Sequence, residues 1–377
     1  GTKTNGGSST VEYYGSLSGL AWGGSYRNLT IGGSGGTVNY GAAISVTGTT
    51  TINASSTLSA NGFSMSLGAL SIAGGSSLTA GNGGATTINT GAVSGQGASA
   101  DLTINTTGVA TLGAIGGNIG TVTVTQSGGV TFQAVSAGTV TLTATAGTID
   151  FQGALNATNL GTAGSGYAVR LRSGGSVASP VTFFNTGALT IDAGFTFASG
   201  ATKTVAGLKS FSGTIASTNA DLNFGTLGAV TIPASATFNP GTGTVTLTGT
   251  TITAGQTLTL GAGGATTINT GTIAGSAASA NLTINTTGVA TLGAIGTNIG
   301  TVTITQSGGV TMASLSAGSL AISDTANGQT VSVSGNLILT TGMSVAGTAN
   351  AYNVSILGSA NSVAGTTTFY NTGSLAV

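Results

Sequence analysis

The chain has 377 residues, of which only 3% are charged, and it contains neither cysteine nor histidine. Since about 25% charged residues is typical of soluble domains, six basic residues are too few for the phosphate track of a nucleic acid. The absence of Cys and His excludes disulfides, thiolate nucleophiles, His-based triads and the usual zinc sites. No window of about 18 uninterrupted apolar residues predicts a membrane-spanning helix.

Short segments with period-2 alternation recur along the chain. Clear examples are TVTVT at 121–125, TVTLTAT at 139–145, TVTLT at 244–248 and TVTIT at 301–305. Alternate side chains of a strand point to opposite faces, so Val and Leu share one face and Thr the other. Gly, Asn and Ser separate these segments, and no stretch of similar length has helical periodicity. The pattern predicts strands of about four to six residues.

A long internal duplication organises the chain. Residues 83–132 and 263–312 align without a gap at an offset of 180, and 41 of the 50 positions are identical. Apolar residues replace apolar ones, as Val124 and Ile304 do, and polar residues replace polar ones, as Asp101 and Asn281 do. The same relation extends the copies to about 83–191 and about 263–377.

The extension of the duplication is not free of insertions. FFNTGALTI at 183–191 matches FYNTGSLAV at 369–377, but at an offset of 186. The second copy therefore holds six more residues, and we expect one longer loop on a single coil to contain them.

These features predict an all-β fold, a right-handed parallel β-helix (β-solenoid) that forms a single elongated stack of short strands over residues 1–377. The alternation of polar and apolar residues is uniform along the chain, and no segment with the composition of a linker separates the copies, as stacked coils require. We expect coils of about 20 residues, and hence roughly 19 coils, within a segment of a longer repeat protein. The expected core residues of the two copies are Leu102, Ile104, Val122, Val124, Leu282, Ile284, Val302 and Ile304.

Several phrases resemble large bacterial surface proteins of the filamentous-haemagglutinin type. They are TVEYYGS with GGSYRNLTIGGSG (10–35), GGVTFQAVSAGTVTLTATAGTIDF (128–151), GYAVRLRSGGSVASPVTFFNTGAL (166–189) and ANAYNVSILGSANSVAGTTTFYNTGSL (349–375). The resemblance implies a secreted β-helix that is exported and displayed as an adhesin or a fibre. The secretion domain that such proteins carry at the N-terminus is not found in this sequence.

Charged residues are the first candidates for chemistry. Asp150 and Asp192 are 42 residues apart, or two coils, but no basic residue is expected around them. Asp101 becomes Asn281 in the second copy, so we interpret the carboxylates as solvated turn residues and not as a catalytic pair. Calcium would need several carboxylates together, and the sequence does not supply them.

The basic residues suggest a second site. Arg170 and Arg172 share one face of AVRLRSG, and Lys203 and Lys209 follow within one or two coils. They could form a small anion-binding spot, but solvated surface charges are the simpler interpretation. Four asparagines precede Thr-Gly, and we expect them to be structural residues in left-handed turns. They are Asn89, Asn185, Asn269 and Asn371.

We therefore expect no catalytic residue, no metal and no cofactor, and not an enzyme. The expected function is a structural, non-catalytic segment of a secreted bacterial surface protein, either a self-associating extracellular fibre or an adhesin shaft. Its expected partners are another copy, bound end to end or laterally, and a host or neighbouring cell surface that is contacted through parts outside this chain. We expect it outside the cell or at the bacterial cell surface, without nucleic acid or a membrane span. The alternatives are a carbohydrate-binding or carbohydrate-cleaving β-helix and an ice-binding Thr-rich solenoid, although Ala, Ser, Gln and Gly interrupt the Thr faces.

Overall fold

The computed structural model describes residues 10–14, 20–21, 24–33, 35–225 and 227–377. Within them the secondary structure is entirely β, without a helix, and parallel strands stack into a β-solenoid of about 18 turns. The predicted all-β solenoid is therefore confirmed, whereas the right hand of its coil stays a prediction. Lys3 and parts of the segment 10–35 lie outside the described residues.

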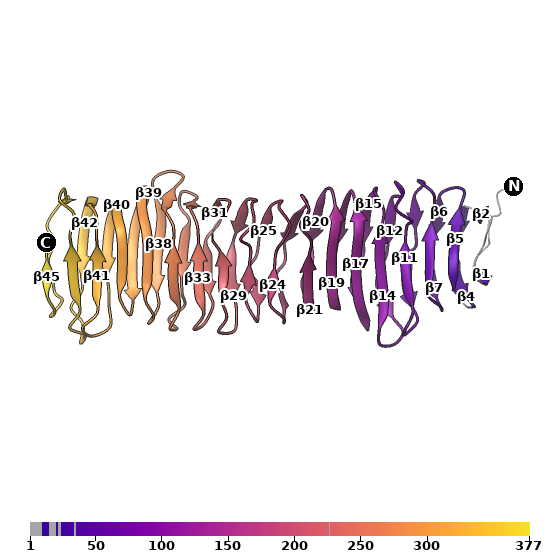
Figure 1. The fold of residues 1–377 in the computed structure, drawn as a ribbon, viewed down its shortest axis with the longest axis horizontal. Coiled ribbons are helices and arrows are strands. Elements are labelled where there is room, and N and C mark those ends of the chain that lie inside the picture. Colours follow the sequence, from indigo (N-terminus) through magenta and orange to yellow (C-terminus); the bar gives the residue numbers. More distant parts are fainter. Residues whose placement is uncertain (1–9, 15–19, 22–23, 34, 226) are drawn as a thin grey trace. The chain divides into compact units, whose positions relative to one another are not determined.

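Contacts between residues divide the chain into two units. Unit 1 comprises Gly1–Ala178 with Phe184–Ala188, and unit 2 comprises Ser179–Phe183 with Leu189–Val377. Within each unit the strands run parallel, each paired with the strand one turn away (Figure 1). Residues 83–132 belong to unit 1 and residues 263–312 to unit 2, so each unit holds one copy of the duplicated segment.

Three parallel sheets form the faces of unit 1. The first sheet contains β1 (Thr10–Tyr14), β4 (Asn28–Gly32), β7 (Thr49–Ile52), β10 (Ala69–Ile72), β13 (Val93–Gly95), β16 (Ile115–Gly116), the start of β19 (Val135–Thr145), the start of β21 (Leu155–Thr162) and β23 (Gly175–Val177). The second sheet contains β2 (Leu20–Ala21), β5 (Gly36–Tyr40), β8 (Ser56–Ser59), β11 (Ser77–Ala80), β14 (Ala100–Asn105), β17 (Ile119–Ser127) and the ends of β19 and β21. The third sheet contains β3 (Gly24–Tyr26), β6 (Ile44–Val46), β9 (Met65–Ser66), β12 (Ile88–Thr90), β15 (Val109–Leu112), β18 (Gly129–Phe132), β20 (Thr148–Phe151) and β22 (Ala168–Leu171).

Unit 2 is built in the same way. Its first sheet contains β24 (Val181–Thr182), β27 (Ala201–Thr202), β30 (Leu222–Phe224), β33 (Thr244–Leu247), β36 (Thr267–Thr270), the starts of β39 (Ala290–Gln306) and β40 (Val310–Ile322), β41 (Thr330–Val333), β43 (Asn353–Ile356) and β45 (Leu375–Ala376). Its second sheet contains β25 (Leu189–Ile191), β28 (Lys209–Phe211), β31 (Val230–Ile232), β34 (Thr250–Ile252), β37 (Ile273–Gly275), the middle of β39 and β40, and the start of β42 (Leu337–Val345). Its third sheet contains β26 (Phe195–Phe197), β29 (Gly213–Ala216), β32 (Ala236–Asn239), β35 (Thr257–Leu260), β38 (Ala280–Asn285) and the ends of β39, β40 and β42, with β44 (Ser362–Val363) paired to β42.

Strand lengths vary more than the sequence predicted. They range from 2 residues in β2 to 17 residues in β39, because β39 continues around the corners and joins all three sheets of unit 2. Paired residues lie 18 apart where Val11 meets Leu29 and 24 apart where Leu78 meets Leu102. The predicted coil length, about 20 residues, falls inside this range.

The six additional residues of the second copy are not in one loop, so this expectation is wrong. In unit 1, Ile149 pairs with Val130 on one side and with Val169 on the other. In unit 2, Val331 pairs in the same way with Val310 and Val354. Their residue numbers show that both of these turns are longer in unit 2. The insertion is therefore distributed over successive turns, since each corner can lengthen slightly without disturbing the paired strands.

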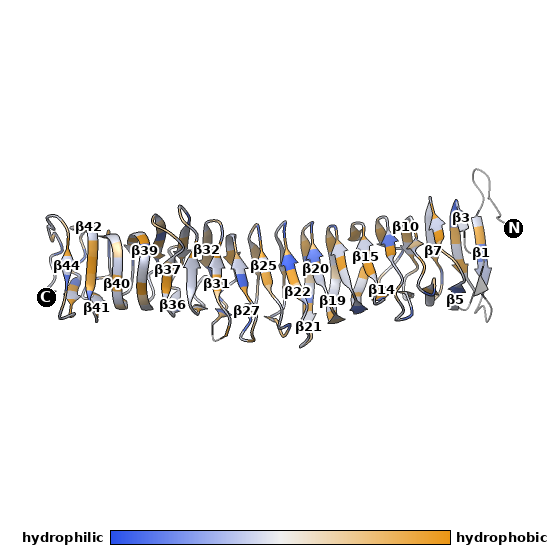
Figure 2. Ribbon diagram, turned by 90° about the horizontal axis from the view of Figure 1, so that it is seen from above, coloured by the Kyte–Doolittle hydropathy of each residue, from blue (hydrophilic) through white to orange (hydrophobic). Residues whose placement is uncertain are grey.

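Figure 2 shows apolar residues, in orange, along the strands. In the alternating segments the apolar residue of each pair is the buried one. All eight expected core residues are completely buried: Leu102, Ile104, Val122, Val124, Leu282, Ile284, Val302 and Ile304. Thr123, between two of them, is half-buried on the outer side. The binary pattern therefore assigns the faces correctly in both copies.

The same corner of the coil interior is polar in both copies of the duplicated segment. Thr106 Oγ1 donates to the Thr86 carbonyl oxygen at 2.5 Å, and Thr286 Oγ1 donates to the Thr266 carbonyl oxygen at 2.5 Å. All four of these threonines are completely buried. Because buried hydroxyls are costly without partners, these bonds make the corner compatible with the apolar core beside it.

Candidate functional site

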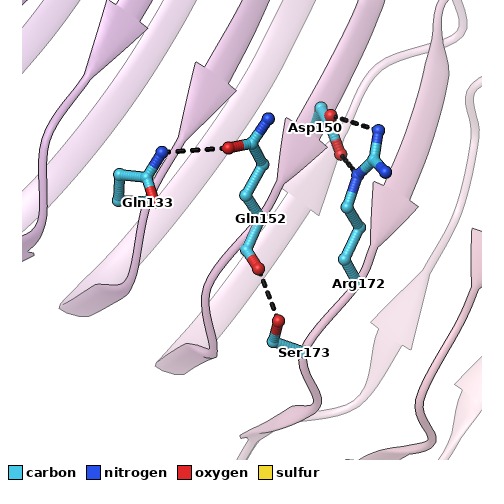
Figure 3. Close-up of polar contacts among 5 residues, drawn as sticks. All are labelled: Gln133, Asp150, Gln152, Arg172 and Ser173. Carbon is cyan, nitrogen blue, oxygen red and sulfur yellow. Dashed lines mark hydrogen bonds and ion pairs between the residues drawn. The ribbon is translucent and has the colours of Figure 1, made fainter.

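Asp150 and Arg172 form the most developed polar site of unit 1. The Asp150 carboxylate accepts two hydrogen bonds from the Arg172 guanidinium, at 2.7 Å from Nε and at 2.9 Å from Nη2 (Figure 3). Its side chain is 13% exposed and that of Arg172 is 39% exposed. The expectation that no basic residue lies near Asp150 is therefore wrong. One turn of the coil places Arg170 directly opposite Asp150 in the register, and Arg172, two residues further along, binds the carboxylate.

A ladder of polar side chains runs beside this pair. Gln133 Nε2 donates to Gln152 Oε1 at 2.9 Å, and Ser173 Oγ donates to the Gln152 carbonyl oxygen at 2.5 Å (Figure 3). The three residues follow the third-sheet strands β18, β20 and β22 at successive turns. These contacts hold one corner of the coil in register.

The same face carries a shallow trough of about 430 Å³. Thr111, Thr131, Thr148, Asp150, Arg170 and Arg172 contribute its polar lining. In the second copy, the column Thr131, Asp150 and Arg170 becomes Thr311, Ser332 and Ser355. The charged trough is therefore a feature of unit 1 and is not repeated.

Asp192, the other carboxylate considered for a catalytic pair, is half-buried in unit 2, whereas Asp150 belongs to unit 1. Among the described residues there is no group of three or more His, Cys, Asp or Glu side chains that could hold a metal ion.

Asp101 is not a solvated turn residue, so that interpretation is wrong. It lies half-buried in β14, where its Oδ1 accepts a hydrogen bond from the Thr121 backbone N–H at 2.7 Å. Asn281 Oδ1 accepts from the Thr301 N–H at 3.0 Å, and Asp221 Oδ1 accepts from the Thr244 N–H at 2.7 Å. The shared requirement is a side-chain oxygen that binds a backbone N–H of the next turn, and either Asp or Asn supplies it.

Asp324 also binds the chain itself. Its Oδ1 accepts hydrogen bonds from Thr348 Oγ1 at 2.9 Å and from Asn350 Nδ2 at 3.1 Å. Burial, and then the charge of Asp324, raise the pKa of Tyr352. The Tyr352 hydroxyl donates to the Ala346 carbonyl oxygen at 2.6 Å, so this cluster joins two corners of unit 2.

The Asn residues of the Asn-Thr-Gly phrases have two different roles. Asn185 Nδ2 donates to the Tyr167 carbonyl oxygen at 3.0 Å, and Asn371 Nδ2 donates to the Tyr352 carbonyl oxygen at 3.0 Å. These two are structural, as expected, although neither has a positive φ. A Cβ added at Gly187 would lie 2.2 Å from the same Tyr167 oxygen, which explains the glycine of the phrase.

Asn89 and Asn269 are different, and their assignment to left-handed turns is wrong. They lie within strands β12 and β36. Left-handed turn positions are taken instead by other asparagines, with φ of 66° at Asn118 and 68° at Asn298. The phrase Asn-Thr-Gly therefore occurs in two structural contexts, which sequence spacing alone cannot separate.

Lys203 and Lys209 are completely buried in unit 2, so their interpretation as solvated or anion-binding surface charges is wrong. Lys209 Nζ donates to the carbonyl oxygens of Leu227 and, at 3.4 Å, of Gly228. The alternation of the sequence around Lys209 could have indicated its inward position, since LKSF places Lys209 in phase with the buried Phe211.

Outward-facing threonines form one uninterrupted column on each unit. In the second sheet of unit 1 the column is Thr37, Thr57, Thr79, Thr103, Thr123 and Thr141. In the third sheet of unit 2 it is Thr214, Thr237, Thr259, Thr283 and Thr303. In unit 1, the neighbouring column on the same face consists of the residues two positions earlier in each strand, and it is interrupted, for example by Asp101 and Asn159. Ice binding needs a flat array of several Thr columns, which this interruption breaks, so it stays a prediction.

Comparison of the sequence with protein-family models, with curated proteins and with solved structures found no match. No helix in the described part of the chain is long and apolar enough to cross a membrane.

Proposed function

We propose that this chain is a structural, non-catalytic segment of a secreted bacterial surface protein similar to filamentous haemagglutinin. Its role is that of a self-associating extracellular fibre or an adhesin shaft. The observation that supports this proposal most is the use of the carboxylates. Asp101, Asp150, Asp221 and Asp324 all bind groups of the chain itself and thereby join successive turns.

Surface chemistry supports self-association. The net charge is zero, with six acidic and six basic residues in 377, and proteins near zero net charge lack the repulsion that keeps copies apart. The threonine columns add hydroxyls that are both donors and acceptors, so one column is chemically complementary to another. The proposed partner is therefore a second copy of this chain, outside the cell.

Electron microscopy of the purified chain tests the proposal. A fibre subunit gives ordered filaments, whereas a shaft gives single particles. The double variant Thr79→Lys with Thr123→Lys puts charge into the threonine column of unit 1. The double variant Ser71→Lys with Ser94→Lys, on the first sheet of the same unit, is the matched control. If filaments form by lateral contact, only the Thr79/Thr123 variant loses them. If they form end to end, both variants keep them. Single particles in the unmodified chain contradict the fibre role.

The trough beside Asp150 favours carbohydrate binding as a second candidate function. Its volume, about 430 Å³, lies within the range of small-molecule sites, and its threonine hydroxyls and Arg–Asp pair could bind sugar hydroxyls. A glycan-array screen with the unmodified chain and with Asp150→Asn tests it. Changing Ser332, which takes the place of Asp150 in the second copy, to Ala is the control. Binding that Asp150→Asn leaves unchanged would contradict a site at the trough.

A further inference from the structure

Lys209 occupies a position that apolar residues hold in the neighbouring turns. In the register of the second sheet of unit 2, it lies between Leu189 and Val230. All three side chains are completely buried. The ammonium group reaches the carbonyl oxygens of Leu227 and Gly228, so the aliphatic part of the side chain crosses the core.

Lys203 is buried in the adjacent sheet of the same turn. The Phe183 N–H donates to the Thr202 carbonyl oxygen and the Lys203 N–H to the Asn223 carbonyl oxygen, both at 2.8 Å. These bonds extend the parallel register beyond Thr202 and place Lys203 in one column with Phe183 and Phe224. All three side chains are completely buried.

The strands stacked on β27 and β28 present apolar side chains to the interior. They are Val181 on β24, Leu222 on β30, Leu189 and Ile191 on β25, and Val230 and Ile232 on β31, all buried. The acidic residues beside these strands are Asp192, half-buried after β25, and Asp221, exposed before β30, whose Oδ1 binds the Thr244 N–H. Burial, and then the charge of Lys209, lower the pKa of Lys203 to about 8, and burial lowers the pKa of Lys209.

We propose that the Lys203–Lys209 pair makes the turns of unit 2 around β27 and β28 a protonation-controlled opening point of the solenoid. Both lysine side chains are completely buried, and the burial of an ammonium group favours any state that returns it to water. In a stack of parallel turns, each turn contacts only its neighbours, so a single weak turn can open without unfolding the rest. The pair thus gives one region of a neutral chain a response to pH.

The direction of the response follows from proton linkage. In the closed state the pKa of Lys203 is about 8, and in an open, hydrated state it returns toward 10.5. Below the lower value both states hold the proton, so the destabilisation is complete and independent of pH. As the pH rises from 8 toward 10.5, the closed state loses its proton first, and opening becomes less favourable.

Hydrogen exchange of the full chain, with Lys203→Met and Lys209→Met, tests the proposal. Met has a similar volume without the charge. At each pH, the exchange rate of residues 201–232 in the unmodified chain is divided by that in the variant, which cancels the intrinsic pH dependence. Residues 280–304 of the same unit are the internal reference, and Lys3→Met is the control for net charge.

The expected rate ratio for residues 201–232 is at least about tenfold at about pH 7 and approaches one at about pH 10. The reference residues 280–304 and the Lys3→Met control give rate ratios near one at both pH values. A ratio that is the same at both pH values contradicts the proposal, as does a rate ratio near one at about pH 7. If Lys203→Met alters residues 280–304 as well, Lys209→Met provides the independent comparison, and equal effects in both regions would also overturn it.

Discussion

The duplicated segments 83–132 and 263–312 keep the same corner contacts in two different units. Gln126 Nε2 donates to the Gly83 carbonyl oxygen at 3.2 Å, and Gln306 Nε2 donates to the Gly263 carbonyl oxygen at 3.3 Å. The pairing of β14 with β17 and that of β38 with the end of β39 contain register shifts at both ends of the shorter strand. Nine substitutions have therefore left these corner contacts and register shifts in place, although the backbone differs at Gly117, whose φ is 59°, and Thr297, whose φ is not positive.

Residues 189–238 of unit 2 build the same coil with a different core. Phe211 stacks near Phe224 and Phe238, with ring centroids 4.7 Å and 5.3 Å away, and the two buried lysines lie in the same turns. In the copies the interior is mainly aliphatic, and Phe132 is the buried aromatic residue of the first. The comparison shows that the strand register and the corner hydrogen bonds define the coil, while its filling can be aliphatic, aromatic or partly cationic.

The aromatic filling can be broken at Phe211. Replacing it with Ala removes two aromatic neighbours and leaves a cavity, which costs about 3–5 kcal/mol. Urea unfolding followed by circular dichroism measures the loss. A cost below about 1 kcal/mol would mean that the lysines and not the phenylalanines determine packing in these turns.

The equivalence of the copies is tested by Ile104→Ala and Ile284→Ala. Both side chains are completely buried, so each change should cost about 2–5 kcal/mol. The flanking side chains are apolar in both copies, although those around Ile284, Leu260 and Ile304, are larger than Ala80 and Val124 around Ile104. We therefore expect the two costs to agree within about 2 kcal/mol. Thr123→Ala, on the outer side, is the control and should cost less than about 1 kcal/mol. Equal costs for Ile104 and Thr123 would show that the faces are wrongly assigned.

A smaller effect is expected at Asn185, which is completely buried and binds the Tyr167 carbonyl oxygen. Asn185→Ala leaves that oxygen with one partner fewer and costs about 1–3 kcal/mol. Asn371 is half-buried and binds the Tyr352 carbonyl oxygen in the same way. Asn371→Ala should therefore lower the free energy of unfolding by less than Asn185→Ala does. A larger loss at Asn371 in the same unfolding assay would contradict this order.

The smallest effect concerns Asp101. Asp101→Asn imitates Asn281 and should change stability by less than about 0.5 kcal/mol, whereas Asp101→Ala removes the acceptor for the Thr121 N–H and costs about 1 kcal/mol. The pair of variants separates hydrogen bonding from charge. A large loss with Asn would mean that the carboxylate charge itself is required.

The sequence predicted the parts of the structure that repeat. Period-2 alternation identified the inward face at Val122 and Val302, and the duplication indicated stacked coils. The unique contacts were not predictable, because they depend on which residue lies one turn away, and the length of the coil changes from turn to turn. The partnership of Asp150 with Arg172 and the burial of Lys203 both depend on that spacing.

Sedimentation of the purified chain at about 0.02 M and about 1 M salt tests the central claim most directly. With so few charges, screening has little to act on, so the account predicts association that is nearly the same at both salt concentrations. A stable monomer at both would contradict self-association and leave only the isolated shaft. Association that disappears at high salt would show that the charged residues, beginning with Asp150, Arg170 and Arg172, control it instead.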